Sequence, residues 1–313
     1  CKIRHEAQRA KHATMGQPGA NSSGSALCDV RSVMNHRRFV SPSFHKAISG
    51  ALSGFALHVA PYVVELVHCG KLIYAGGDDV LALVPLREAL TTAEDLRWGF
   101  QGRGRPEEPL GFLKAPESKG GYTGWRDGQV LCLMGHTASA SAGVAVVHHM
   151  APLRSAIEDA HELCRLAKDK YKRDAIAVGV VKRSGAPLRT GGRFEHAGKC
   201  LTSAVLRLVQ LMQGTDCVGE LSTGLPARIF SEVELIGRMP PKAQQAELLR
   251  LMQRQFQPRG PRDRRDGNAD EYRRFLDEEW WPLTKQWEPS EAYFELARWL
   301  LVARFIASPG GVE

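Results

Sequence analysis

The sequence predicts an α+β fold for residues 40–185 and an all-α domain for residues 186–313, after an irregular or truncated segment over residues 1–39. Three observations support this division. Helix-like and strand-like apolar patterns alternate in the first region, whereas helical spacing dominates the second. The N-terminal segment is poorly patterned and contains the loop-like run GQPGANSSGS. The chain of 313 residues is also longer than one hydrophobic core requires.

The first expected element is a long amphipathic helix over about residues 42–67. Ser41-Pro42 has the pattern of an N-cap followed by proline in the first helical turn. Apolar residues then recur every three to four positions, which is the spacing of one helix face. Gly70 is expected to end the helix.

Two short apolar strands follow at 71–75 and 80–84, and the tetrad Gly76-Gly77-Asp78-Asp79 lies between them. Strands that flank a glycine-containing tetrad predict a β-hairpin. Because both strands are wholly apolar, we expect a buried hairpin whose tip reaches a cleft.

The rest of the first domain is expected in the order helix, strand, helix and strand. This order predicts a mixed sheet covered by helices on one face, and one more strand before residue 41 would complete a ferredoxin-like palm topology. Residues 101–128, rich in glycine, proline and charge, are expected to form an insertion or loop. The expected helices and strands are 86–100, 143–149, 152–171 and 175–181.

In the second domain, helical spacing is interrupted by a basic loop, QPRGPRDRR, at 257–265. The expected helices are 199–213, 231–237, 241–256, 270–280 and 289–307.

Charge and cysteine usage narrow the class of protein. The formal net charge of +8 favours a polyanionic partner, although a solvated basic surface is the alternative. Seven widely spaced cysteines without a C-x-x-C pair argue against a zinc ribbon and favour a reducing, cytoplasmic compartment. The charged N-terminus lacks the apolar run of a signal peptide. Neither a membrane span nor a membrane partner is expected, because the nearest candidate, Ala292 to Ala307, is interrupted by charges.

The tetrad carries the pattern that most directly indicates chemistry. Gly76 and Gly77 allow a tight turn and a close approach of the backbone to a phosphate. The adjacent carboxylates of Asp78 and Asp79 are oxygen ligands that suit Mg²⁺ or Mn²⁺. The alternative is an ordinary Asp-rich turn that holds no metal.

At this point a family resemblance can be stated. The run Leu72 to Pro85, which includes the GGDD tetrad, is similar to the second palm domain of the large subunit of Cmr-type (type III-B) CRISPR complexes. The tetrad alone is shared more loosely with GGDEF-type cyclases. Further similar segments are Val40 to Ser49, Ser141 to His149, Ala151 to Leu153 and, in the helical domain, Ala303 to Ala307.

The resemblance implies an enzyme that converts ATP to cyclic oligoadenylates, with other complex subunits, crRNA and target RNA as partners. It implies that Asp78 and Asp79 are catalytic and hold Mg²⁺ or Mn²⁺, and that the two glycines bind nucleotide. It also assigns an adenine contact to Ser49 and a triphosphate contact to Lys168. A serine bonded to its own helix backbone and a solvated helix lysine are the alternatives.

The three other candidate histidines, His45, His148 and His149, are expected to be structural or RNA-facing. The last two should point to opposite faces of a strand, so that they cannot share a metal.

The sequence departs from the family at its N-terminus. Palm domains of this kind start with a strand that carries an Asp-x-Asp-like pair before Met-Gly, but Met15-Gly16 follows Lys11-His12-Ala13-Thr14. Either one expected metal ligand is therefore missing or the N-terminus is abnormal. The resemblance also implies a cyclase that works at the interface of two palms. A catalytically weak scaffold subunit is the second hypothesis, and a GGDEF-like dinucleotide cyclase ranks third.

Overall fold

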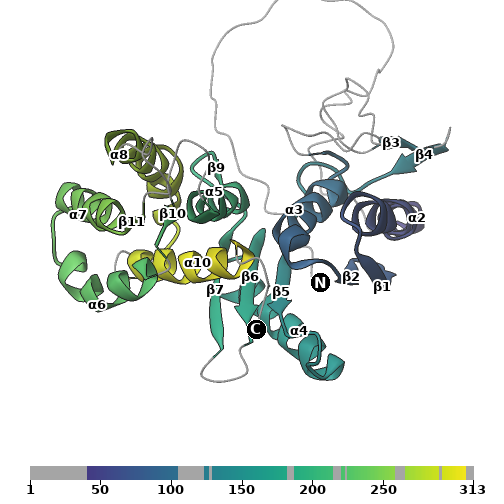
Figure 1. Cartoon of the computed structure of the whole chain (residues 1–313). Coiled ribbons are helices and arrows are strands. Elements are labelled where there is room, and N and C mark those ends of the chain that lie inside the picture. The colour runs from purple at the N-terminus through teal and green to yellow at the C-terminus, as the bar shows by residue number, and fades with distance from the viewer. Residues whose placement is uncertain are drawn as a thin grey trace, which may run out of the picture.

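The computed structural model describes most of the chain beyond residue 40. Helices dominate it, with small sheets between them (Figure 1), so the α+β prediction is confirmed. The expected segment 1–39 and most of the basic loop at 257–265 lie outside the described residues. The described ranges are 41–104, 123–126, 129–181, 187–213, 220–222, 224–257, 265–288 and 291–307.

The predicted long helix is present as a continuous run of three pieces, α2 (Pro42–Gly54), η1 (Phe55–Val59) and η2 (Tyr62–Val67). The predicted N-cap is confirmed, since the Ser41 hydroxyl accepts a hydrogen bond from the Phe44 N–H at 3.3 Å. The last two pieces are π-helical and flank Pro61. A proline inside an α-helix lacks a donor and clashes with the carbonyl one turn earlier, and wider turns accommodate such insertions.

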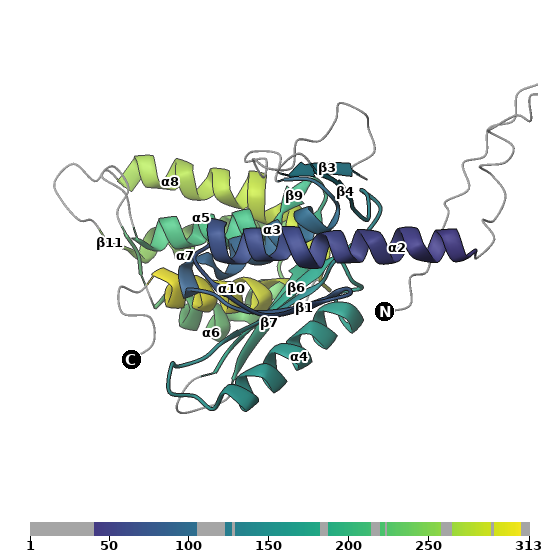
Figure 2. The same cartoon turned by 90° about the vertical axis from the view of Figure 1, so that its right-hand side faces the viewer.

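This helix also corrects the expectation that no membrane-length apolar stretch exists. The 26 residues from Pro42 to Val67 include a window with mean hydropathy of 1.5, so length and composition alone would allow the helix to cross a membrane. However, 44% of that window is buried against other parts of the protein. In Figure 2, α2 runs across the front of the molecule beside the sheets.

The predicted hairpin is confirmed as β1 (Lys71–Gly76) paired antiparallel with β2 (Asp79–Leu83). A second, three-stranded sheet has the order β5-β6-β7. Its strand β5 (Ala142–Val146) is parallel to β6 (Ala175–Val180), which is antiparallel to β7 (Leu188–Arg193), so this sheet is mixed as predicted. Among the described residues, neither hairpin strand pairs with it.

Two expectations about the sheet need correction. All six residues of β6 are buried, which requires cover on both faces rather than on one. In addition, β7 lies beyond residue 185, so the sheet continues past the expected domain boundary. The second region is therefore not exclusively helical, because its backbone also forms β7 and four two-residue strands, β8 (Glu195–His196), β9 (Lys199–Cys200), β10 (Glu220–Leu221) and β11 (Phe256–Gln257).

In the first region the remaining elements are η3 (Leu86–Glu88), α3 (Ala89–Phe100), the hairpin of β3 (Thr123–Arg126) with β4 (Gln129–Cys132), and α4 (Leu153–Asp169). The helices α3 and α4 lie close to their predicted positions. The hairpin of β3 with β4 was not predicted, and β3 lies within residues 101–128, which were expected to form an insertion or loop. In the second region the remaining elements are α5 (Leu201–Gln213), α6 (Leu225–Gly237), α7 (Pro241–Arg254), α8 (Arg265–Arg274), η4 (Phe275–Trp280), α9 (Trp281–Thr284) and α10 (Ala292–Ala307).

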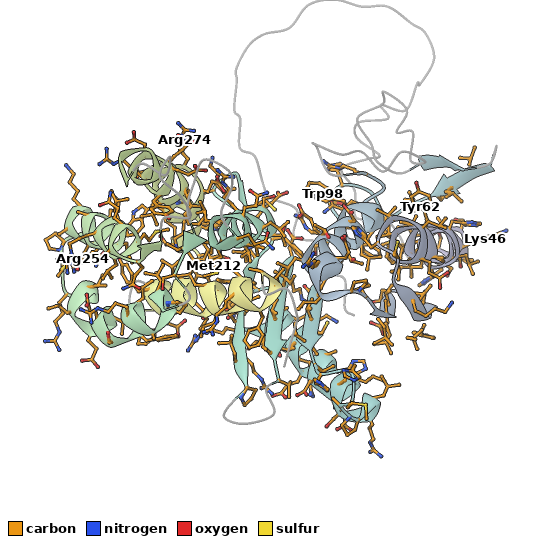
Figure 3. All side chains as sticks on the ribbon, in the orientation of Figure 1. Lys46, Tyr62, Trp98, Met212, Arg254 and Arg274 are labelled. Atoms are coloured by element: carbon orange, nitrogen blue, oxygen red, sulfur yellow. The ribbon has the colours of Figure 1, made fainter. Side chains whose placement is uncertain are left out.

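Two hydrophobic clusters hold these elements together, and they do not follow the expected boundary. The larger joins β6 and α4 to the C-terminal helices, with Trp280 and Trp299 fully buried. The smaller joins the long helix to the end of α3 through Phe55 and Phe100, whose rings meet edge to face at 5.1 Å. In Figure 3, Met212 lies inside the molecule, whereas Lys46 lies at its edge.

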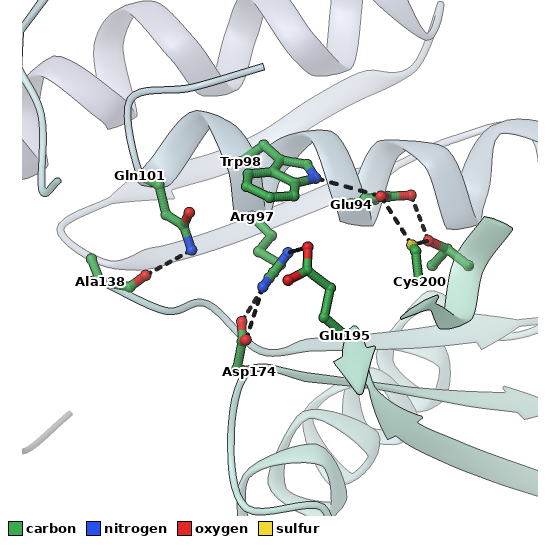
Figure 4. Close-up of polar contacts among 9 residues, drawn as sticks. Glu94, Arg97, Trp98, Gln101, Ala138, Asp174, Glu195 and Cys200 are labelled. Carbon is green, nitrogen blue, oxygen red and sulfur yellow. Dashed lines mark hydrogen bonds and ion pairs between the residues drawn. The ribbon is translucent and has the colours of Figure 1, made fainter. Parts of the chain in front are cut away.

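Helix α3 contributes to both clusters and also carries a polar contact to the second region (Figure 4). The buried Arg97 guanidinium binds Asp174 through two nitrogens, at 2.6 and 2.8 Å, and Glu195 at 3.2 Å. The same guanidinium lies over the Trp98 ring, 4.7 Å from its centroid. This ion-pair cluster ties α3 to the start of β6 and to β8.

Close backbone packing of α4 on β5 predicts the cost of adding one methyl group. A Cβ at Gly143 would collide with the backbone of Cys164 and Ala160 and lie 2.9 Å from the carbonyl carbon of Leu163. We expect Gly143→Ala to lower the free energy of unfolding by about 1–3 kcal/mol, because a helix backbone cannot yield locally.

Urea denaturation with Gly50→Ala as the matched control measures this effect. A Cβ at Gly50 meets nothing within 4 Å, and it lies inside α2. The control should be neutral or stabilising by up to about 1 kcal/mol. Equal stability of the two variants would contradict the close-packing argument.

Candidate functional site

The GGDD tetrad forms a two-residue hairpin turn. Gly76 pairs with Asp79 at the ends of the strands, which leaves Gly77 and Asp78 as the central residues. Gly77 has a φ of 61°, whereas Asp78 is not in the left-handed region. This φ pattern is that of a type II′ turn, which favours glycine at its first central position and matches the twist of the flanking strands.

The two glycines are needed for different reasons. Gly77 requires freedom at positive φ, and a Cβ there would meet nothing within 4 Å, so the tip is open around it. At Gly76 a Cβ would lie 2.6 Å from the Cζ atom of Tyr74, whose ring covers this glycine. The turn is therefore accessible from the side of Gly77.

The carboxylates of Asp78 and Asp79 are both exposed. Neither has a hydrogen-bond or ion-pair partner among the residues that the structure describes. Two unpartnered carboxylates fit Mg²⁺ or Mn²⁺, which are commonly held by one or two carboxylates together with substrate phosphates. Within the described ranges no group of three or more His, Cys, Asp or Glu side chains could hold a metal, so phosphate and water would complete the coordination.

The expectation of a buried hairpin is wrong, since none of its residues is buried. Among the described residues the two strands pair only with each other, and β1 has a register shift between Leu72 and Tyr74, where Ile73 is the extra residue. A bulge of this kind interrupts the in-out alternation. Ile73 and Tyr74 are consequently both exposed.

The hairpin is fixed to the long helix at the start of β1. Glu65 in η2 accepts a hydrogen bond from the Lys71 ammonium at 2.8 Å and another from the Leu72 N–H at 3.3 Å. The bond from Lys71 and then the bond from Leu72 hold the pKa of the Glu65 carboxyl below its ordinary value. Glu65 therefore fixes the direction in which β1 leaves the helix.

Among the described residues, neither of the other two candidate nucleotide contacts has a hydrogen bond or ion pair with the turn. Ser49 is exposed on α2, and its hydroxyl makes no hydrogen bond to any described residue, so it does not bond to its own helix backbone. Lys168 is partly buried near the end of α4, which packs on β5 and β6. Both assignments stay predictions.

The histidine pair corrects a second expectation. Strand β5 ends at Val146, so His148 and His149 lie in the following turn and do not alternate across a strand. Their ring centroids are 4.2 Å apart. The third candidate, His45, is exposed on the first turns of α2.

Sequence patterns alone missed the buried charges of α3. His68 is enclosed by Glu88 and Asp95, and Arg97 by Asp174 and Glu195. The sequence does contain a signal for these buried charges, because residues 86–100 carry charged residues next to the apolar residues of the same helix. Charged side chains in such positions are buried only when they are paired.

The model of the Cas10/Cmr2 second palm domain matches residues 24–115 and 122–177. This range includes the long helix, the GGDD hairpin, α3, β5 and α4. The chain carries a Cas10/Cmr2 second palm domain. The resemblance of its GGDD region to that family is thereby confirmed.

Two Cmr2 proteins are similar in sequence to parts of this chain. The chain is 33% identical over 159 residues to the CRISPR system Cmr subunit Cmr2 of Pyrococcus furiosus, covering 50% of this chain and 15% of that protein. It is 41% identical over 68 residues to the CMR subunit Cmr2 of Saccharolobus solfataricus, covering 21% of this chain and 6% of that protein. The chain thus spans only a small part of both relatives.

A solved structure of a type III-B Cmr-beta complex in the apo state is also similar to this chain. The TM-score is 0.52, and the match covers 75% of this chain and 24% of the other. At 19% identity this match concerns the fold alone. Its coverage exceeds the palm domain, so the similarity of fold extends into the helices beyond residue 177.

Proposed function

We propose that this chain is the cyclase-bearing part of a large type III-B CRISPR subunit, which makes cyclic oligoadenylates from ATP with Mg²⁺ or Mn²⁺ at Asp78 and Asp79. The observation that carries the proposal is the pair of exposed, unpartnered carboxylates at the tip of a II′ hairpin in a Cas10/Cmr2 palm. The finer fold proposed is a ferredoxin-like palm. The proposed compartment is the cytoplasm.

In this mechanism the 3′-hydroxyl of one ATP attacks the α-phosphate of another. A new phosphodiester bond forms, the α–β bridging bond breaks, pyrophosphate leaves, and the hydroxyl proton passes to solvent. Asp78 and Asp79 would hold Mg²⁺ or Mn²⁺, which when bound would lower the pKa of the attacking hydroxyl and stabilise charge on the leaving oxygen. The carboxylates of Asp78 and Asp79 supply the negative charge of the site. The side of the turn that is open around Gly77 admits the triphosphate.

The proposed partners are the other subunits of a type III-B complex, with crRNA and target RNA bound through that assembly. The net charge of +8 suits contact with RNA phosphates. Ser49 and Lys168 are the proposed adenine and triphosphate contacts.

A scaffold that docks RNA and neighbouring subunits is the second candidate. It is favoured by the lack of a third metal-ligating side chain near the turn within the described residues. On this hypothesis the hairpin keeps its turn geometry but does not catalyse nucleotide transfer.

A product assay on the assembled complex separates these functions. The complex is incubated with target RNA, Mn²⁺ and labelled ATP or GTP, and the products are resolved by chromatography. We expect oligoadenylate from ATP only when target RNA is present. A cyclic dinucleotide from GTP would indicate a GGDEF-like cyclase, and an intact RNA-bound complex without any nucleotide product would indicate the scaffold.

A further inference from the structure

The base of the GGDD hairpin is fastened by a buried histidine. His68 follows η2 and precedes β1, and only 4% of its side chain is exposed. Its Nε2 atom lies 2.8 Å from Oδ2 of Asp95, a carboxylate of α3 that is 2% exposed. Its Nδ1 atom lies 2.9 Å from Oε2 of Glu88, which ends η3. We call these three residues the His68 clamp.

The clamp joins the two ends of the hairpin. The chain enters the hairpin just after His68 and leaves it toward Glu88, while Asp95 belongs to the helix behind both. The residues just before β1 and just after β2 are closely packed, because a Cβ at Gly70 would lie 2.7 Å from Cγ1 of Val84. The chain turns there through Cys69, which has a φ of 50°. One side chain thus links entry, exit and α3.

The two contacts restrict the protonation state of the ring. A neutral imidazole has one N–H, so it can donate to one carboxylate while its other nitrogen lone pair faces the second. The imidazolium has two N–H groups and satisfies both carboxylates with charge-assisted bonds. The geometry at both nitrogens therefore favours the charged ring.

The local electrostatics agree with this geometry. Burial lowers the pKa of His68, but the hydrogen bonds and charges of Asp95 and Glu88 outweigh burial and raise it above the ordinary value. These two acids, from α3 and η3, are the charged groups that act on the ring. The Thr91 hydroxyl also contacts the Oε2 atom of Glu88, at 3.4 Å.

We propose that His68, as an imidazolium, is a positioning residue. It fixes both ends of the hairpin to α3 and so determines where Asp78 and Asp79 lie. The role in activity rests on the proposed function, whereas the mechanical role does not. Because the pKa is raised in the folded state, the stabilisation is fully present below the ordinary pKa of 6.5. It is lost as the pH rises through the folded value.

Hydrogen exchange measured by mass spectrometry tests the mechanical role in the full chain. We expect His68→Gln to raise exchange of the peptides over 71–83 by about tenfold, since a single amide cannot satisfy both acids. Exchange in β5 and β6 should stay unchanged. His45→Gln, an exposed histidine on α2, is the matched control and should leave the hairpin unaffected. Unchanged hairpin exchange, or an equal rise throughout the chain, would overturn the proposal.

Asp95→Asn provides a variant that keeps hydrogen-bonding groups but removes one charge. In this variant the pH at which hairpin exchange accelerates should move to lower values, and the alkaline limb of product formation by the complex should move with it. An exchange profile that does not shift overturns the clamp. Shifted exchange in a complex that makes no product upholds the clamp and counts against the proposed function alone.

Discussion

Replacing Asp78 and Asp79 together by asparagine is expected to lower product formation by about a hundredfold or more, because the loss of outer-shell partners alone costs a metal site 10–100-fold. Both carboxylates are exposed and unpartnered among the described residues, so the folded state loses no bond. Asparagine is also accepted in tight turns. The free energy of unfolding should therefore change by no more than about 0.5 kcal/mol.

Three measurements on one preparation check this result: product formation in the complex, Mn²⁺ binding by calorimetry, and thermal unfolding. The matched control is Glu234→Gln, an exposed acid on α6 without a partner in the described structure. It should leave all three unchanged. Full product formation by the double asparagine variant would show that the carboxylates are not the ligands.

The second large effect is expected at Arg97, whose side chain is 5% exposed. Arg97→Ala removes two bonds to Asp174 and one to Glu195, and it leaves a partly buried carboxylate at the start of β6 without its counter-charge. Breaking a buried pair from one side typically costs 3–5 kcal/mol, and the partial exposure of both acids places this case near about 3 kcal/mol. Arg97→Lys should cost less, since charge remains but the two-nitrogen contact does not.

Equilibrium unfolding in urea measures this loss, with Arg154→Ala as the control. Arg154 pairs with Glu158 on α4, but its side chain is 91% exposed. An exposed pair of this kind contributes about 0.5 kcal/mol or less. If the two alanine variants were equally stable, the contacts of Arg97 with Asp174 and Glu195 would contribute no more than a surface ion pair.

Sequence patterns predicted the elements of this fold better than their assembly. The helix from Ser41, the two hairpin strands and the helices of the second region all occur close to the expected positions, because each depends on local spacing, caps and turn residues. The pairing of β7 with β6 was not predicted. It joins residues on both sides of the expected boundary, and no local pattern encodes such a partner.

The candidate site shows the same limit. Gly77 and Asp78 could be placed at a turn from the tetrad alone, because few sequences satisfy a II′ hairpin. The exposure of Ile73 and Tyr74 in β1 could not be predicted in this way, since one extra residue at Ile73 changes which side chains face outward. The two carboxylate partners of the buried His68 are 20 and 27 residues away along the chain. Pairs of that kind are visible only once α3 is packed.

The separation of the hairpin from the three-stranded sheet has a consequence for association with other chains. Within the described ranges, β1 and β2 form strand pairs only with each other. Unpaired backbone groups along such open edges readily pair with an extended chain. A molecule whose open edges stay uncovered would therefore be prone to self-association.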